Sequence, residues 1–353
     1  MNSGELYYFS FFLIFIVIAL IIDLGVFNKH DHIVRSKQAL LKTIVWISLA
    51  FAFYLILHFY GENIHGISSM ESLKFHINKY GQTIALIENN YTQSVINYRH
   101  ELSLEFLTGY VIEEALSMDN LFVIILIFTA FNVEKRLYHR VLFWGIIGAV
   151  LFRFLFIFTG SFLITKFEWI LYLFAAFLIF TGIRMFVNRN QEEKIETESH
   201  PVVKFASKYF SIHEHFVGNK FFVKINHKNL ITPLFLVLLI IEFTDILFAV
   251  DSIPAIFAVT KDPYIVFFSN IFAILGLRSL FFLLINIIHK FHFFKHGLSV
   301  LLVFIGIKMI FNDWLKEHGF TIEDSLIIIG TILTLSIVLS LLIPEKKKHF
   351  IKH

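Results

Sequence analysis

Nine apolar stretches, each close to the length that crosses a bilayer as a helix, constrain the fold of this chain more than any other feature. The hydrocarbon core of a membrane takes about 20 apolar helical residues. The first stretch has no basic segment before it and no small-residue cleavage site, so we expect it to remain in the protein. The predicted spans cover residues 7–27, 40–60, 106–130, 141–164, 168–187, 232–260, 264–288, 297–312 and 324–343.

The composition agrees with a membrane protein and excludes several other classes. Charged residues make up 16% of the 353 residues and apolar residues 57%, whereas soluble domains have about a quarter charged residues. The net charge of +3 is too small for a nucleic-acid partner bound through phosphate contacts. The chain has no cysteine, which excludes disulfides, thiolate metal sites and cysteine nucleophiles. We therefore predict an all-α, polytopic helix bundle with the lipid bilayer as its surroundings.

The distribution of lysine and arginine predicts the orientation of the chain. If the spans alternate in direction, the loops on one side carry 20 basic residues and those on the other side carry 6. Basic loops stay in the cytoplasm. The pattern therefore predicts a multi-pass protein with its N-terminus outside and its C-terminus in the cytoplasm, with about nine transmembrane helices.

Two parts of the chain repeat the same polar pattern. An acid precedes Asp119-Asn120 by six positions, at Glu113, and the same spacing separates Asp245 from Asp251-Ser252. Arg153 and Arg278 follow mid-span, and Gly182-Ile183-Arg184-Met185 matches Gly306-Ile307-Lys308-Met309. Each copy has three spans, an odd number, so the copies must cross the membrane in opposite directions. Inverted repeats of this kind surround a central site in many secondary transporters.

The repeat divides the chain into six segments. Residues 1–60 form two N-terminal transmembrane helices, and 61–105 form an extracytoplasmic polar insert. Residues 106–187 form repeat 1, 188–231 a cytoplasmic loop and 232–312 repeat 2. Residues 313–353 form the last transmembrane helix and a basic cytoplasmic tail.

Acidic residues inside these spans are the candidate functional groups. One charge at mid-bilayer costs about 2.5–3.5 kcal/mol, so six unpaired acids cost on the order of 15 kcal/mol, comparable to the stability of a whole domain. Two arginines, Arg153 and Arg278, can compensate only two of them. A divalent cation, protons or both would offset the rest. The six acids are Glu113, Glu114, Asp119, Glu242, Asp245 and Asp251.

We predict a metal site formed by five of these acids. Glu114 has no counterpart in the second copy, so we assign it no role. Asn120 and Ser252 would add neutral oxygen ligands or position the aspartates. Oxygen ligands favour Mn²⁺, Mg²⁺ or Ca²⁺ over Cu⁺ or Zn²⁺, but they do not separate Mn²⁺ from Ca²⁺. The predicted ligands are Glu113, Asp119, Glu242, Asp245 and Asp251.

The spacing of these acids predicts breaks in both motif helices. Residues six positions apart on a continuous helix differ by about 240° and do not share a face. Pro254 and the polar pairs Asp119-Asn120 and Asp251-Ser252 are unfavourable inside a helix. We therefore expect two interrupted motif helices, whose free carbonyl groups would join the carboxylates as ligands.

The two motifs resemble those of the TerC/Alx family of integral membrane proteins. Glu113-(x)5-Asp119-Asn120 is similar to the first motif, and the stretch from Glu242 through Asp245 and Asp251 to Pro254 is similar to the second. Residues 140–145, 269–278 and 304–309 extend the similarity. The resemblance implies a bacterial inner-membrane protein of metal-ion homeostasis. It links the chain to manganese export, to manganese supply for exported enzymes and to tellurite resistance, with these same acids as the functional residues.

Three functions remain open at this point. The first is a transporter that exports Mn²⁺ in exchange for protons or driven by the membrane potential, with no prosthetic group. The second is a membrane scaffold that senses metal or delivers it to exported or membrane proteins. The third is an intramembrane hydrolase using paired acids. The excess of acids and the inverted repeat favour transport, and we do not expect an enzyme.

Overall fold

The computed structural model describes residues 3–23, 36–82, 84, 86–87, 90–167, 169–188, 201–225, 228–285, 291 and 293–343. The basic tail after residue 343 and most of the acid-rich start of the predicted cytoplasmic loop lie outside the described residues.

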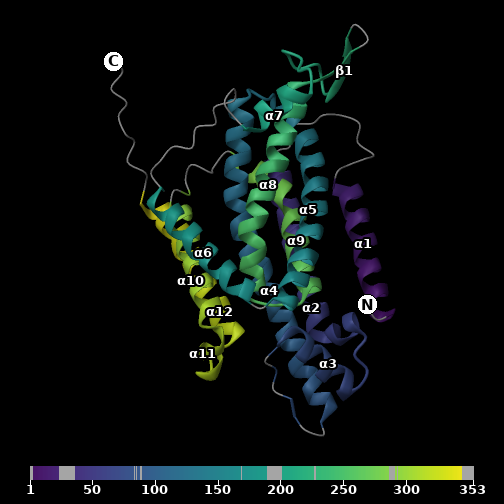
Figure 1. The fold of residues 1–353 in the computed structure, drawn as a ribbon, viewed down its shortest axis with the longest axis vertical. Coiled ribbons are helices and arrows are strands. Elements are labelled where there is room, and N and C mark those ends of the chain that lie inside the picture. The colour runs from purple at the N-terminus through teal and green to yellow at the C-terminus, as the bar shows by residue number, and fades with distance from the viewer. Residues whose placement is uncertain are drawn as a thin grey trace.

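Within the described residues, every predicted span overlaps a helix (Figure 1). The helices are α1 (Ser3–Asp23), α2 (Ser36–Tyr60), α3 (Met70–Tyr80), α4 (Tyr91–Ala130), α5 (Tyr138–Lys166), α6 (Trp169–Val187), α7 (Pro201–Tyr209), α8 (Pro233–Phe257), α9 (Pro263–Leu284), α10 (Phe294–Ile310), α11 (Asn312–Glu317) and α12 (Ile322–Leu342). Two short 3₁₀ helices, η1 (Gly61–His65) and η2 (Lys135–Leu137), precede α3 and α5. Among the described residues, six helices are long and apolar enough to cross a membrane by themselves, so the predicted count of nine spans is not confirmed. These six are α2, α5, α6, α8, α9 and α12.

The two ends of the bundle carry different elements. Figure 1 places α3 and α11 at one end, and α7 with the β-hairpin at the other. The hairpin pairs β1 (Phe222–Ile225) with β2 (Lys228–Ile231), so the chain is not purely α-helical. Helix α4 begins at Tyr91, inside the predicted polar insert. Its 40 residues extend about 60 Å, twice the thickness of a bilayer core.

Helix α9 lies at the centre of the bundle. In its most apolar window, 89% of the residues are buried inside the protein, and it packs against α2, α4 and α5. Helix α1 covers it with aromatic rings: Phe12 lies 4.2 Å from Phe268 and 5.8 Å from Phe272, centroid to centroid. The many phenylalanines therefore fill the core between helices as well as the lipid-facing surface.

Helices α6 and α10 cross at two glycines. A Cβ on Gly182 would lie 2.8 Å from the carbonyl oxygen of Ser299, and a Cβ on Gly306 would lie 2.8 Å from that of Ala175. Each glycine thus contacts the residue seven positions before its counterpart in the other helix. The absence of a side chain lets the two backbones approach closely, as small residues do between membrane helices.

The predicted breaks in the motif helices are wrong. Helix α4 is continuous through Asp119-Asn120, and α8 is continuous through Asp251-Ser252 and Pro254. Asn120 donates to Asp245 on another helix instead of competing for its own backbone. Pro254 lies in the last turn of α8, where its missing N–H removes one intrahelical hydrogen bond, to the carbonyl group of Val250, without ending the helix. Both motif helices therefore pass the site without the predicted interruption.

Candidate functional site

One face of α4 carries the polar residues of the first motif. Glu113, Ser117 and Asn120 follow one another at helical spacing and are all buried. The hydroxyl of Ser117 donates to Glu113 Oε1 over 3.3 Å. Asp119 lies on the adjacent face of the continuous helix, as the helical period requires, and is 8% exposed.

Arg153 of α5 connects the two motifs. It is 2% exposed, and its guanidinium forms an ion pair with Glu113 of α4. Its Nη2 lies 3.4 Å from Asp245 Oδ1 of α8, and its Nη1 donates to Asn270 Oδ1 of α9 at 2.8 Å and to Ser252 Oγ at 3.4 Å. One cation thus holds together four helices in the middle of the bundle.

Asn270 and Asn120 complete this network. Asn270 Nδ2 donates to Glu113 Oε2 at 3.1 Å, and Asn120 Nδ2 donates to Asp245 Oδ1 at 2.9 Å. Asn270 is fully buried. It is a site residue that the sequence analysis missed, although an amide inside an otherwise apolar span is a recognisable signal of function.

A small cavity of about 20 Å³ lies beside Arg153. That volume holds one water molecule or one cation. Three predicted ligands from both motifs, Glu113, Asp119 and Asp251, line it together with Arg153. The neutral polar side chains of Ser117, Asn120 and Ser252 also line this cavity.

A second cavity of about 20 Å³ lies next to Asn120 and Arg153 and is lined by Asp245. Asp245 Oδ2 and Asn120 Oδ1 are buried and have no hydrogen-bond partner among the residues that the structure describes. Buried oxygens without a donor are costly, so they suit a cation or a water molecule. The side chains of Asn120 and Arg153 thus contribute to both cavities.

The remaining predicted residues lie away from these two cavities. Glu242 packs against α5, where its carboxylate occupies the space above Gly148; a Cβ there would lie 2.0 Å from Glu242 Oε2. Arg278 is buried and its guanidinium contacts His139 of α5. Thr181 of α6, another residue that the sequence analysis missed, donates to Asp251 Oδ1 at 3.3 Å.

The structure therefore divides the five predicted ligands. Glu113, Asp119 and Asp251 face one cavity, Asp245 faces the other, and Glu242 lines neither. Across the described part of the chain, no three histidine, aspartate or glutamate side chains are close enough to hold a metal ion together. Arg153 lies between the carboxylates of Glu113 and Asp245 and neutralises part of their charge.

Comparison with known proteins agrees with the resemblance seen in the motifs. Residues 98–348 match the model of the integral membrane protein TerC family. An uncharacterized membrane protein of Myxococcus xanthus, STKORF319, is 41% identical over 96% of this chain and 92% of its own length.

Two further relatives carry the name Alx and are described as candidate membrane-bound redox modulators. The protein of Photorhabdus laumondii is 37% identical over 98% of both chains. That of Escherichia coli K12 is 38% identical over 93% of this chain and 92% of its own length. No solved structure matches the chain.

Proposed function

The chain belongs to the TerC family of integral membrane proteins, and on that premise we propose that it exports divalent metal cations, with Mn²⁺ as the principal ion. The observation that carries the proposal is the cavity beside Arg153, where three carboxylates from the two motif helices, Glu113, Asp119 and Asp251, face the same small space. The three acidic side chains offer only oxygen atoms as ligands, which suits a hard cation.

Arg153 acts as an internal competitor for the transported ion. Its guanidinium contacts Glu113 and Asp245, so a metal cation binding these carboxylates must displace it. The arginine keeps the acids compensated when the ion leaves, because unpaired buried carboxylates are strongly unfavourable. The ion is then bound weakly enough to be released, which a transport site requires.

The inverted repeat supplies the conformational change. The reciprocal packing of Gly182 and Gly306, with α4 against α9 and α5 against α8, agrees with two three-helix units related by a two-fold axis. Rocking of one unit against the other would open the cavities beside Arg153 to each side of the membrane in turn. In this rocking scheme the chain crosses the inner membrane of a bacterial cell nine times. Helix α7 and the hairpin lie in the cytoplasm, and α3 and α11 lie outside the membrane.

Ion flux by the purified chain tests the proposal. Full-length protein in liposomes should move Mn²⁺ faster than Mg²⁺, Ca²⁺ or Zn²⁺, measured with a metal-sensitive dye trapped inside. A scaffold that delivers metal through partner proteins would show no flux under these conditions. The lack of cysteine already excludes thiol–disulfide exchange by this chain.

Two substitutions test the site itself. Asp119→Asn and Asp251→Asn should abolish flux and manganese tolerance while the protein remains in the membrane. Glu114→Gln is the matched control, because Glu114 is also an acid on α4 but lines neither of the two cavities. Normal flux in both aspartate variants would show that the site is assigned to the wrong residues.

A further inference from the structure

A third, much larger cavity of about 780 Å³ lies at the end of the bundle that carries α3 and α11. Its volume is in the range of small-molecule binding sites. Its walls come from α3, α4, α6, the α8–α9 loop, α10, α11 and α12. None of the residues that line the two cavities beside Arg153 lines it, so the metal proposal gives it no role.

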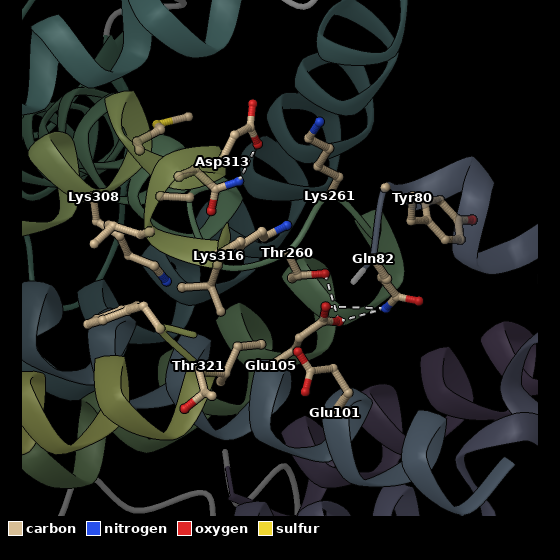
Figure 2. A pocket seen from close by; sticks show the side chains of 18 of the residues that line it. Tyr80, Gln82, Glu101, Glu105, Thr260, Lys261, Lys308, Asp313, Lys316 and Thr321 are labelled. Carbon is tan, nitrogen blue, oxygen red and sulfur yellow. Dashed lines mark hydrogen bonds between the residues drawn. The ribbon is translucent and has the colours of Figure 1, made fainter. Parts of the chain in front are cut away.

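Three lysines line this cavity without a hydrogen bond or an ion pair to any residue that the structure describes. They are Lys261 of the α8–α9 loop, Lys308 of α10 and Lys316 of α11. Lys308 is only 8% exposed, and Figure 2 shows its amino group directed into the cavity. Most of the Lys308 side chain is buried but its amino group opens onto the cavity, so an anionic ligand in the cavity would pair with it in place of water.

Carboxylates line the same cavity from α4 and α12, and Asp313 of α11 lines it near Lys316. Glu105 already accepts hydrogen bonds from Gln82 and Thr260, and Glu323 pairs with His100. Glu101 has neither a hydrogen bond nor an ion pair within the described residues, and Figure 2 shows it across the cavity from Lys308. Burial and the nearby charge of Glu323 raise the pKa of Glu101, so a cationic partner would stabilise its carboxylate.

We propose that this cavity binds a phosphate group linked to a primary amine, with the phosphate on Lys308 and Lys316 and the ammonium on Glu101. A phosphate offers several acceptor oxygens, enough for more than one lysine, whereas a carboxylate offers two. Because Glu101 lines the same cavity as these lysines, a zwitterion fits its charges better than a simple anion. The apolar residues Leu171, Phe257 and Leu315, which also line the cavity, would contact the remainder of the ligand.

This chemistry has two sources, free phosphoethanolamine and the headgroup of phosphatidylethanolamine. The full-length protein in a nonionic detergent is titrated with phosphoethanolamine, inorganic phosphate, ethanolamine and phosphocholine by calorimetry. The same protein in nanodiscs is tested for preferential retention of phosphatidylethanolamine over phosphatidylcholine. Binding of the free molecule identifies a soluble ligand, and selective retention alone identifies the lipid; either result supports the proposal.

Single substitutions then assign the residues. Lys316→Gln and Lys308→Met should each weaken binding about 10- to 100-fold, the effect of losing one charge-assisted hydrogen bond. Glu101→Gln should reduce the preference for phosphoethanolamine over inorganic phosphate. Lys204→Gln is the matched control, because Lys204 lies on α7 at the opposite end of the bundle.

Two results would overturn the proposal. One is the absence of binding in both the calorimetric and the nanodisc experiments. The other is unchanged affinity in both lysine variants. Lys316 is exposed on a short helix, so its variant should fold normally, and this test remains decisive if Lys308→Met reduces expression.

Discussion

Replacing Arg153 by methionine should destabilise the protein more than any other single change in the bundle. The guanidinium is 2% exposed and holds Glu113, Asp245, Ser252 and Asn270. Methionine fills a similar volume but leaves two buried carboxylates without their cation. Removing one partner of a buried ion pair costs about 3–5 kcal/mol, which is a large part of the roughly 5–15 kcal/mol that stabilises a typical domain.

The same argument predicts a compensating variant. Adding Glu113→Gln and Asp245→Asn to Arg153→Met removes the two uncompensated charges, so the triple variant should recover at least about half of the lost free energy. Arg184→Met is the control, because Arg184 is exposed near the end of α6 and its replacement should change stability by less than about 0.5 kcal/mol.

Unfolding of the detergent-solubilised protein by a titration with SDS, followed by circular dichroism, measures these differences. A loss below about 1 kcal/mol in Arg153→Met would show that the guanidinium does not compensate the acids. A triple variant no more stable than Arg153→Met would show that the loss comes from packing and not from charge.

Three further predictions concern packing and helix ends. Gly182→Ala places a Cβ 2.8 Å from a carbonyl oxygen of α10 and should cost about 1–3 kcal/mol in the same unfolding titration, whereas Gly330→Ala, with open space around it, should be neutral. Gly148→Ala should displace the Glu242 carboxylate, which lies 2.0 Å from the new Cβ, and lower Mn²⁺ flux in liposomes about tenfold. Asp262→Ala removes the N-cap of α9 and the 2.7 Å contact with His65, so it should cost about 2–4 kcal/mol by unfolding.

Each of these three predictions would be contradicted by a specific result. Equal stability of the Gly182 and Gly330 variants would mean that α6 and α10 do not pack closely at this crossing. Unchanged flux in Gly148→Ala would show that the position of the Glu242 carboxylate does not affect transport. An Asp262→Asn variant, which keeps an oxygen for the cap, should lie between the wild type and Asp262→Ala; the reverse order would show that the cap is unimportant.

Much of the fold could be predicted from the sequence because the driving force acts locally. An apolar stretch of about 20 residues has few options in lipid other than a helix, and each of the nine predicted stretches overlaps a helix in the described part of the chain. The start of α4 at Tyr91 was missed, because residues 91–105 carry polar side chains on most faces and lack an apolar pattern. The β-hairpin was missed because its two strands have only four residues each.

The sequence by itself determined that the apolar spans contain six acids and two arginines, in a pattern that occurs twice. Only the tertiary structure decided how they are grouped. Arg153 lies between Glu113 and Asp245, Asn270 enters from α9, and Glu242 turns to Gly148 of α5. The reason is geometric: position along one helix fixes the face on which a side chain lies, but the partner on that face belongs to another helix.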